Sequence, residues 1–290
     1  MATMKAIKKR ISSVNNTKKI MKAMDLVAAA KLQKARMRLE NVLPLYDNIK
    51  LVMQGIKESL ATAGGEVAFA EDREVKSIAY IVISSDRGLC GGYNVNVGKE
   101  ALACVNTNKD KPEKIIAIGA KGAEYFRRRG KNVAYKSAGA SEATTFEDAE
   151  RIGDMVASMY KSGEADEVYL VYTHFQSILV HTPHIEKILP IRAKAPGDGS
   201  AVAGAVEMSY DPDVATFISR AVPMYLNVTI YGAMMESAVC EYASRMTSMD
   251  SATRNATEII EDLTLEYNRK RQGMITQEIT EIVSGANALK

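Results

Sequence analysis

Residues 7–43 read IKKRISSVNNTKKIMKAMDLVAAAKLQKARMRLENVL, a stretch with neither glycine nor proline. It is rich in Ala, Lys, Met, Leu and Arg, which lose little side-chain entropy in a helix. A four-three heptad walk that starts here is apolar at fourteen of its sixteen positions, which are Ile7, Ile11, Val14, Lys18, Met21, Asp25, Ala28, Leu32, Ala35, Leu39, Val42, Tyr46, Ile49, Met53, Ile56 and Leu60. A seam of this length predicts a coiled-coil helix. Pro44 lies inside it and predicts curvature rather than an end.

The far end of the chain repeats the pattern, since residues 233–272 also lack glycine and proline. A second walk is apolar at ten of twelve positions, which are Val228, Gly232, Met235, Val239, Tyr242, Met246, Met249, Thr253, Ala256, Ile260, Leu263 and Tyr267. The phase then slips by one residue, and the next apolar set is Ile275, Ile279, Ile282, Ala286 and Leu289. Each seam needs an apolar partner, so we expect the two ends to form an antiparallel coiled coil.

The middle of the chain alternates strand and helix patterns. Strands are expected at 75–84, 115–118 and 168–172, with an edge strand near 133–136, and helices around 120–129 and 145–162. Thr145 and Asp148 have the spacing of a capping box, and residues 193–205 are expected to form a loop. We therefore predict an α/β protein, with a long antiparallel coiled coil of N- and C-terminal helices and a central Rossmann-like domain with a mainly parallel sheet. The expected segments are 1–60, 75–195 and 210–290.

Charge is unevenly distributed along the 290 residues. The formal total is only +3, but residues 1–40 hold eleven Lys or Arg and two acids, a net +9, so the other 250 residues carry −6. A basic end favours contact with an acidic protein, with nucleic acid or with anionic lipid, and does not choose among them.

Composition excludes several classes of protein. Apolar residues make up 47% and charged residues 25%, as in ordinary globular chains. No run approaches 18 apolar residues, and the first residues lack the apolar core of a signal peptide. Three cysteines without a C-x-x-C spacing fit a reducing compartment. We expect a soluble intracellular protein.

Residues with possible chemistry do not assemble into a catalytic, cofactor or metal site. The loop SSDRGLCGGY (84–93) follows a strand but lacks the P-loop and G-x-G-x-x-G patterns, so a tight loop or surface contact is favoured over phosphate binding. Cys90 has no nearby base and is expected to be inert or merely exposed. His181 and His184 lack further ligands and are expected in a turn beside a strand. Glu261 and Asp262 are expected to be solvated.

Three segments resemble the gamma subunit of F-type ATP synthases. They are KKIMKAMDLVAAAKLQKA (18–35), SSDRGLCGGYNVNV (84–97) and YNRKRQGMITQEITEIVSGANAL (267–289). The resemblance implies the central rotor stalk of the proton-translocating enzyme, which couples rotation of the c ring to conformational change in the catalytic beta subunits. It implies a subunit that is non-catalytic in itself, within an ATP-synthesising, H+-transporting complex.

The resemblance also implies positions for functional residues. Arg271 and Gln272 match the family's catch, with Thr276 and Glu278 beside them, and Met24 and Arg245 match positions implicated in coupling to the beta subunits. Arg87 and Cys90 lie in a loop similar to one near the beta C-terminal domains. Tyr210 and Asp211 match the foot that contacts the c ring and epsilon, although Asp211 stands where Glu is often found.

The implied partners are three alpha and three beta subunits, the epsilon subunit and the c ring, with delta reached only through the complex. Nucleic acid is not implied, and the membrane is reached only through the c ring. The absence of a chloroplast-type regulatory insertion and of a transit peptide implies a bacterial protein, peripheral on the cytoplasmic face of the cell membrane. The driving ion, H+ or Na+, is set by other subunits.

Two other hypotheses remain open on the sequence. One is an α/β enzyme domain with a dimerising coiled coil, which would bind a nucleotide or substrate by itself. The other is a nucleic-acid-binding rod, which would show steeply salt-dependent affinity; it is disfavoured because residues 1–45 contain no aromatic residue.

Overall fold

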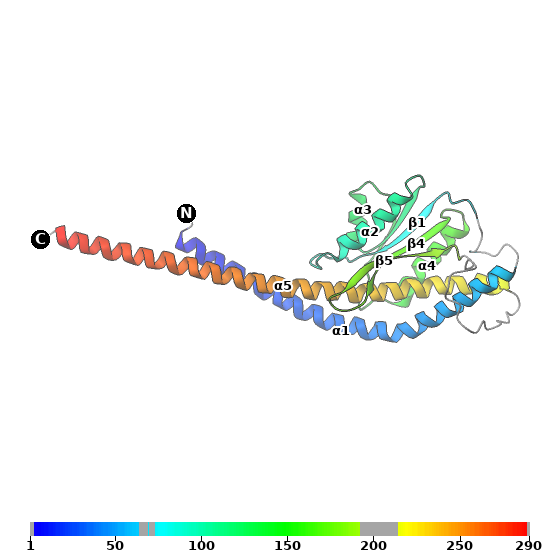
Figure 1. The fold of residues 1–290 in the computed structure, drawn as a ribbon, viewed down its shortest axis with the longest axis horizontal. Coiled ribbons are helices and arrows are strands. Elements are labelled where there is room, and N and C mark those ends of the chain that lie inside the picture. Colours follow the sequence, from blue (N-terminus) through cyan, green and yellow to red (C-terminus); the bar gives the residue numbers. More distant parts are fainter. Residues whose placement is uncertain (1–2, 64–68, 70–72, 192–213, 289–290) are drawn as a thin grey trace. The chain divides into compact units, whose positions relative to one another are not determined.

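The computed structural model describes residues 3–63, 69, 73–191 and 214–288. Helices α1 (Met4–Ala63) and α5 (Val214–Ala288) flank the α/β segment in the sequence (Figure 1). Contacts group the chain into two compact units, unit 1 (Met1–Ala29 with Arg245–Lys290) and unit 2 (Ala30–Ser244). The predicted fold class is confirmed: two long terminal helices and a central α/β part with a mainly parallel sheet. The predicted segment bounds 1–60, 75–195 and 210–290 stay a prediction.

The heptad seams predict which side chains are covered. All described positions of the first walk are buried or half-buried, from Ile7 to Met53. The same holds for all twelve positions of the second walk, from Val228 to Tyr267. The charged exceptions, Lys18 and Asp25, are half-buried within the seam. The covered stripe therefore follows the 3.5-residue repeat rather than the identity of each residue.

The two long helices run antiparallel within unit 2. Gly232 of α5 lies against the ring of Tyr46 of α1, and the Lys31 ammonium lies 5.6 Å from the centre of the Tyr242 ring. Residue numbers thus rise along α1 as they fall along α5. Unit 1 contains the start of α1 and the end of α5, which run in opposite directions side by side (Figure 1).

Within the part of the chain that the structure describes, the sheet of unit 2 has five strands in the order β3-β2-β1-β4-β5. Strands β1 (Ile78–Ile83), β2 (Glu113–Ile118), β3 (Val133–Ser137) and β4 (Glu167–Phe175) are parallel, and β5 (His181–Leu189) is antiparallel to β4. All six residues of β1 are buried, as expected for a central strand covered on both faces.

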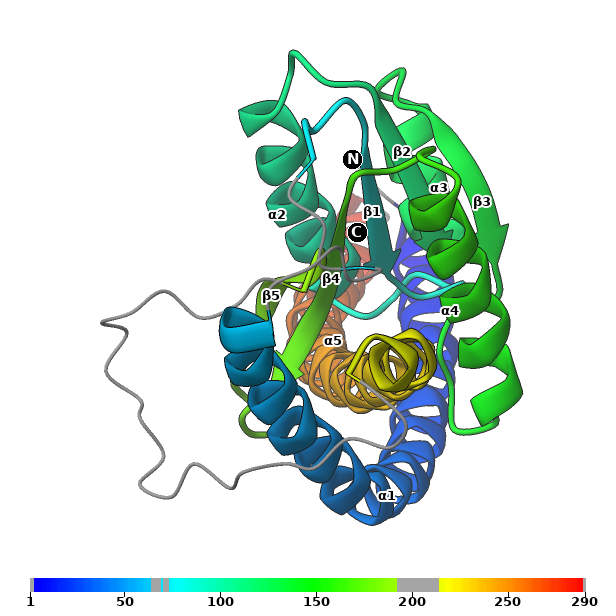
Figure 2. The same cartoon turned by 90° about the vertical axis from the view of Figure 1, so that its right-hand side faces the viewer.

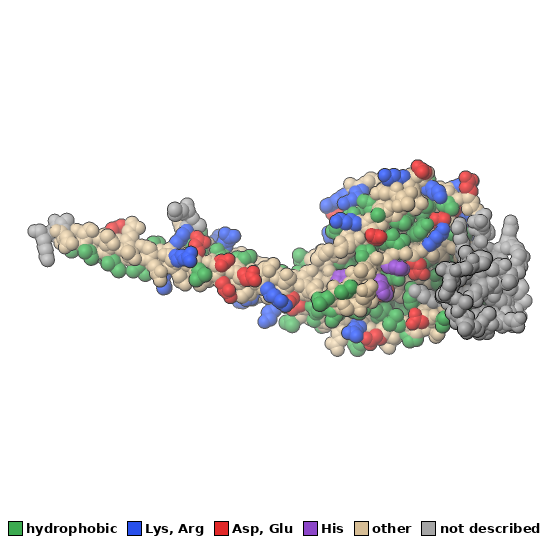
Figure 3. All heavy atoms as spheres, viewed as in Figure 1, with side chains coloured by type: hydrophobic (Ala, Val, Ile, Leu, Met, Phe, Trp, Pro, Cys, Tyr) green, Lys and Arg blue, Asp and Glu red, His purple; other side chains and the backbone are tan. Residues whose placement is uncertain are grey.

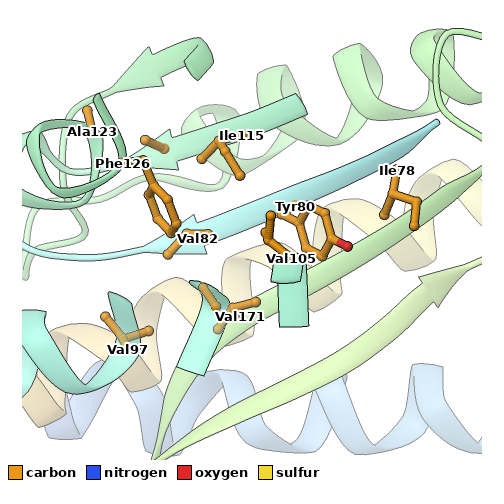
Figure 4. Packing of buried hydrophobic residues seen from close by; sticks show 11 residues of the cluster. Ile78, Tyr80, Val82, Val97, Val105, Ile115, Ala123, Phe126 and Val171 are labelled. Atoms are coloured by element: carbon orange, nitrogen blue, oxygen red, sulfur yellow. The ribbon is translucent and has the colours of Figure 1, made fainter. Parts of the chain in front are cut away.

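Helices cover both faces of this sheet. Helices α2 (Tyr93–Thr107) and α3 (Ala120–Arg127) pack on one face through Val97, Ala101 and Phe126. Figure 4 shows the Phe126 ring beside Val82 in this core. Helix α4 (Phe146–Lys161) and the part of α5 that belongs to unit 2 lie on the other side of the sheet from α2 (Figure 2).

Most predicted elements are present. The expected edge strand is β3, at the end of the sheet, and α1 continues through Pro44 without a break. Thr145 caps α4 through a capping box with Asp148, as predicted. Glu261 and Asp262 are exposed. The expected loop at 193–205 lies outside the described residues.

The prediction of a turn at His181 and His184 is wrong, because both belong to strand β5. Pro183 and the polar composition hid this strand. A proline is tolerated there because β5 is an edge strand, where a missing N–H need not break a ladder on both sides.

Helix α2 was also missed in the residue patterns. Its sequence, YNVNVGKEALACVNT, holds β-branched residues and a glycine, which are weak helix formers. Burial of Val97, Ala101 and Val105 against the sheet stabilises it instead. Its glycine, Gly98, lies in contact with the Tyr125 ring, where a Cβ atom would be crowded.

Candidate functional site

The predicted functional residues fall into both units. Met24, Arg245 and the four residues of the α5 end belong to unit 1, whereas Arg87 and Cys90 belong to unit 2. Tyr210 and Asp211 lie outside the described residues. The structure therefore presents two candidate surfaces, a helix end and a loop.

The helix end carries four predicted residues within about two turns of α5. Arg271, Gln272, Thr276 and Glu278 are all exposed. The Thr276 hydroxyl donates to the Gln272 carbonyl at 2.9 Å, which holds that side chain against its own helix. The other three side chains extend from the helix surface and are available to a partner.

An apolar stripe continues past the last covered seam position, Tyr267. Its members Ile275, Ile279 and Ile282 are 46%, 57% and 71% exposed. Hydrophobic side chains follow one side of this helix end in Figure 3. A continuous apolar stripe on an exposed helix indicates a contact surface.

Met24 and Arg245 are half-buried in unit 1. Beside them on α1, off the covered seam, the large apolar side chains of Ile20, Leu26 and Val27 are more than half exposed. The heptad pattern did not identify these three residues, because it considers only the positions on the covered seam and not those on the outer face of the helix.

The loop Ser84–Gly92 is held by polar contacts within unit 2. The Ser85 amide donates to Asn94 Oδ1 at 2.9 Å and the Ser85 hydroxyl donates to the Arg87 carbonyl at 2.6 Å. From α5, the Ser244 hydroxyl donates to the Cys90 carbonyl at 2.7 Å. The loop is therefore fixed at both its start and its end.

Cys90 is buried rather than exposed, contrary to one of the two readings of its thiol. It is 2% exposed, and Asn94 Nδ2 donates to its sulfur at 3.1 Å. It packs with Tyr93 and Cys240 in a small apolar cluster. Burial raises the pKa of the neighbouring Cys240 thiol, which disfavours a reactive thiolate there.

Two residues on the outer side of the loop are exposed to solvent. Arg87 is exposed, and Leu89 is 64% exposed at a positive φ of 64°. At the same carboxyl edge of the parallel strands, the β4–β5 turn exposes Leu179 to 80%, with Ile178 and Val180 also exposed. The motif analysis missed this turn, although three consecutive large apolar residues between strands are a visible signal.

The carboxyl edge of the sheet is where phosphates bind in many α/β proteins. Here the Asp86 carboxylate accepts hydrogen bonds from the amides of Ala120 and Gly139, both at 2.9 Å. The Ser84 hydroxyl accepts from the Gly122 amide at 2.8 Å. The first turn of α3 is thus occupied by the protein's own side chains, and α4 is capped by its capping box.

Among the described residues, no group of three or more His, Cys, Asp or Glu side chains is placed to hold a metal ion. The Nδ1 atom of His174 lies 2.6 Å from Glu236 Oε1. None of the described helices combines the length and apolar character needed to cross a bilayer.

Comparisons with known proteins give one consistent family. Residues 3–289 match a family model described as ATP synthase. The ATP synthase gamma chains of Alkaliphilus metalliredigens and Desulforamulus reducens are 44% and 40% identical over 290 residues, with at least 99% of each chain covered. The gamma chain of Acetobacterium woodii, named sodium ion specific, is 39% identical over 298 residues and covers 98% of this chain and 97% of its own.

Solved structures agree in fold. A chain of the Euglena gracilis mitochondrial ATP synthase, in a structure of its OSCP, F1 and c-ring assembly, has a TM-score of 0.69 at 16% identity. The match covers 99% of this chain and 94% of that one. A chain of the Tetrahymena thermophila mitochondrial central stalk and c ring has a TM-score of 0.59 at 23% identity, over 80% of this chain and 99% of that one.

Proposed function

This chain belongs to the ATP synthase gamma-chain family, and we propose that it is the central rotor stalk of a bacterial F-type enzyme. Ion flow turns the c ring, the stalk turns with it, and each orientation of the stalk favours a different conformation of a catalytic beta subunit. The stalk can do this only by contacting the open and closed forms of beta unequally. Protons are the expected driving ion, and other subunits make the choice between H+ and Na+.

The observation that carries the proposal is the exposed end of α5. Its apolar stripe at Ile275, Ile279 and Ile282 lies beside the polar residues that match the family's catch. We propose that a ring of three alpha and three beta subunits surrounds this end. The apolar stripe then rotates against an apolar inner surface of that ring. Arg271 and Gln272 make polar contacts with the ring that depend on the rotation angle of the stalk.

The other predicted residues take the following roles in this proposal. Thr276 and Glu278 act beside the catch, and Met24 and Arg245 contribute to coupling with beta. Arg87 and the loop carrying the buried Cys90 face the beta C-terminal domains, and Tyr210 and Asp211 form the foot on the c ring and epsilon.

We propose that the subunit is non-catalytic and holds no cofactor. Support comes from the carboxyl edge of its sheet. There the side chains of Ser84 and Asp86 already accept hydrogen bonds from backbone amides that a bound phosphate would need. The alternative of an α/β enzyme with a dimerising coiled coil would need free backbone amides at this edge to bind a nucleotide phosphate. The same contacts therefore favour a scaffold over an enzyme.

The chain's place in the cell follows from the same proposal. It sits on the cytoplasmic face of the bacterial membrane as a peripheral subunit, bound through the c ring and epsilon, with delta reached only through the complex. The basic face of residues 1–40 meets acidic surfaces of beta during rotation, and each such surface pair contributes about 0–1 kcal/mol.

Reconstitution with alpha and beta subunits tests the proposal. The expected result is that ATPase activity of the mixture rises several-fold when this chain is added, because only the assembled ring is driven through its states in order. Titration calorimetry of the chain alone with ATP and with NAD is the matched control, and we expect no binding. ATPase activity that does not depend on the chain would contradict the rotor proposal. Nucleotide binding by the chain alone would favour the α/β enzyme alternative.

A further inference from the structure

Glu142 joins the α/β part of unit 2 to both long helices at once. Its carboxylate lies 2.6 Å from the Lys31 ammonium of α1, and it accepts a hydrogen bond from the Tyr242 hydroxyl of α5. The Lys31 ammonium also lies over the Tyr242 ring, 5.6 Å from its centre. One carboxylate in the loop before α4 therefore receives a donor from each helix.

The contact is more than a surface ion pair. The Glu142 side chain is only 21% exposed, whereas the Lys31 side chain is 42% exposed. Burial acts to raise the pKa of its carboxyl, but the hydrogen bonds from Lys31 and Tyr242 prevail and lower that pKa to about 2. A carboxylate with two charge-assisted or phenolic donors in a partly dry setting is held more firmly than an exposed pair.

Other hydrogen bonds between the α/β part and the long helices include contacts that reach one helix each. The Ser237 hydroxyl of α5 lies 3.4 Å from the Thr173 amide that donates to it. On the α1 side, Arg38 donates to the Thr144 carbonyl at 3.4 Å, close to the limit for a hydrogen bond. Shorter contacts to α5 also exist, such as the Ser244 hydroxyl donating to the Cys90 carbonyl at 2.7 Å. The Glu142 carboxylate is distinguished because it contacts a donor from each of the two helices.

One carboxylate that is bonded to both helices ties each helix to the α/β part and to the other helix. Lys31 and Tyr242 come from helices whose axes, when packed, lie about 8–10 Å apart, and both side chains reach the same carboxylate. A contact to a single helix leaves the other helix free to shift around it.

We propose that Glu142 is a positioning residue that fixes the α/β part to both α1 and α5. Its contacts raise the torsional stiffness of the rotor, so that the α/β part and the two helices rotate together. This inference rests on the proposed rotor function. It assigns to Glu142, Lys31 and Tyr242 a role in the stiffness of the rotor, separate from the residues that contact beta.

The test uses the reconstituted alpha–beta ring fixed to a surface, with a bead attached through Lys109→Cys on the α/β part. With the ring stalled by ADP, the angular variance of the bead reports rotor stiffness. We expect Glu142→Gln to raise this variance about two-fold, because the carboxylate accepts bonds from both helices. Lys31→Gln and Tyr242→Phe should each give part of that rise.

Two controls separate stiffness from folding and from surface charge. Glu40→Gln removes an exposed pair with Arg36 on α1 alone and should leave the variance unchanged. The exchange of Lys31→Glu with Glu142→Lys should restore stiffness that each single change lowers. Thermal unfolding of each chain shows whether stability has changed.

Unchanged variance in Glu142→Gln and in Tyr242→Phe would overturn the inference, even if their melting temperatures fell. Failure of the exchange to restore stiffness would also contradict it. If the wild-type assembly does not rotate on addition of ATP, the rotor proposal fails instead, so the two failures are distinguishable.

Discussion

Replacing Ala28 with aspartate is expected to lower the free energy of unfolding by about 3–5 kcal/mol, through an unpaired buried charge and added volume. Ala28 is 1% exposed on the covered seam of α1. An aspartate carboxylate at this position would be shielded from water, and natural domains are stable by only about 5–15 kcal/mol. Denaturant unfolding of the isolated chain measures the effect.

Ala30 provides the matched control two residues further along the same helix. It is exposed, so Ala30→Asp should cost only about 0.5 kcal/mol of helix propensity. Similar losses at the two positions would contradict the covered seam, because the chemical change is identical and only the face of the helix differs.

Replacing Gly119 with alanine is expected to cost about 3–5 kcal/mol, from an unfavourable backbone conformation and a steric clash. Gly119 has φ 104° and ψ 139°, a region that side chains rarely adopt. A Cβ atom there would lie well inside the contact distance of the Ser84 carbonyl oxygen. The change pushes β1 away from the start of α3, and chemical unfolding measures the loss.

Gly130 is the control that separates backbone strain from steric clash. It also has a positive φ, 69°, but a Cβ atom there would meet nothing within 4 Å. Gly130→Ala should therefore cost only about 1–2 kcal/mol, the penalty of the left-handed conformation. A loss at Gly119 no greater than at Gly130 would mean that the close approach of Ser84 is not structurally important.

The coiled-coil seam could be predicted from the sequence because it depends on a local repeat. Lys18 and Asp25 break the apolar pattern, yet neighbours at every third or fourth position keep them on the covered face. The capping box at Thr145 was predictable for the same reason, since both partners lie three residues apart.

Strand β5 and helix α2 could not be predicted so directly. Pro183 argues against a strand until its edge position is known, and Gly98 argues against a helix until its packing on Tyr125 is known. In both elements the tertiary position overrides the local preference.

The candidate site was only partly accessible to sequence reasoning. The exposure of Ile275 and Ile279 follows from three-dimensional packing, because the heptad pattern alone treats them as seam residues. The contact of Glu142 with Lys31 and Tyr242 joins residues 111 and 100 positions apart, so no local pattern points to it. Asp86 as a link between β1, α3 and the segment after β3 was missed for the same reason.

The most direct test of the central claim is to observe the rotation of this chain within the alpha–beta ring. The alpha–beta ring is fixed to a surface, a bead is attached through Lys109→Cys, and ATP is added while hydrolysis is followed in parallel. The rotor account predicts continuous rotation of the bead in one direction, at a rate that rises with ATP concentration. A bead that stays at a fixed angle while the assembled ring hydrolyses ATP at an undiminished rate would contradict the account.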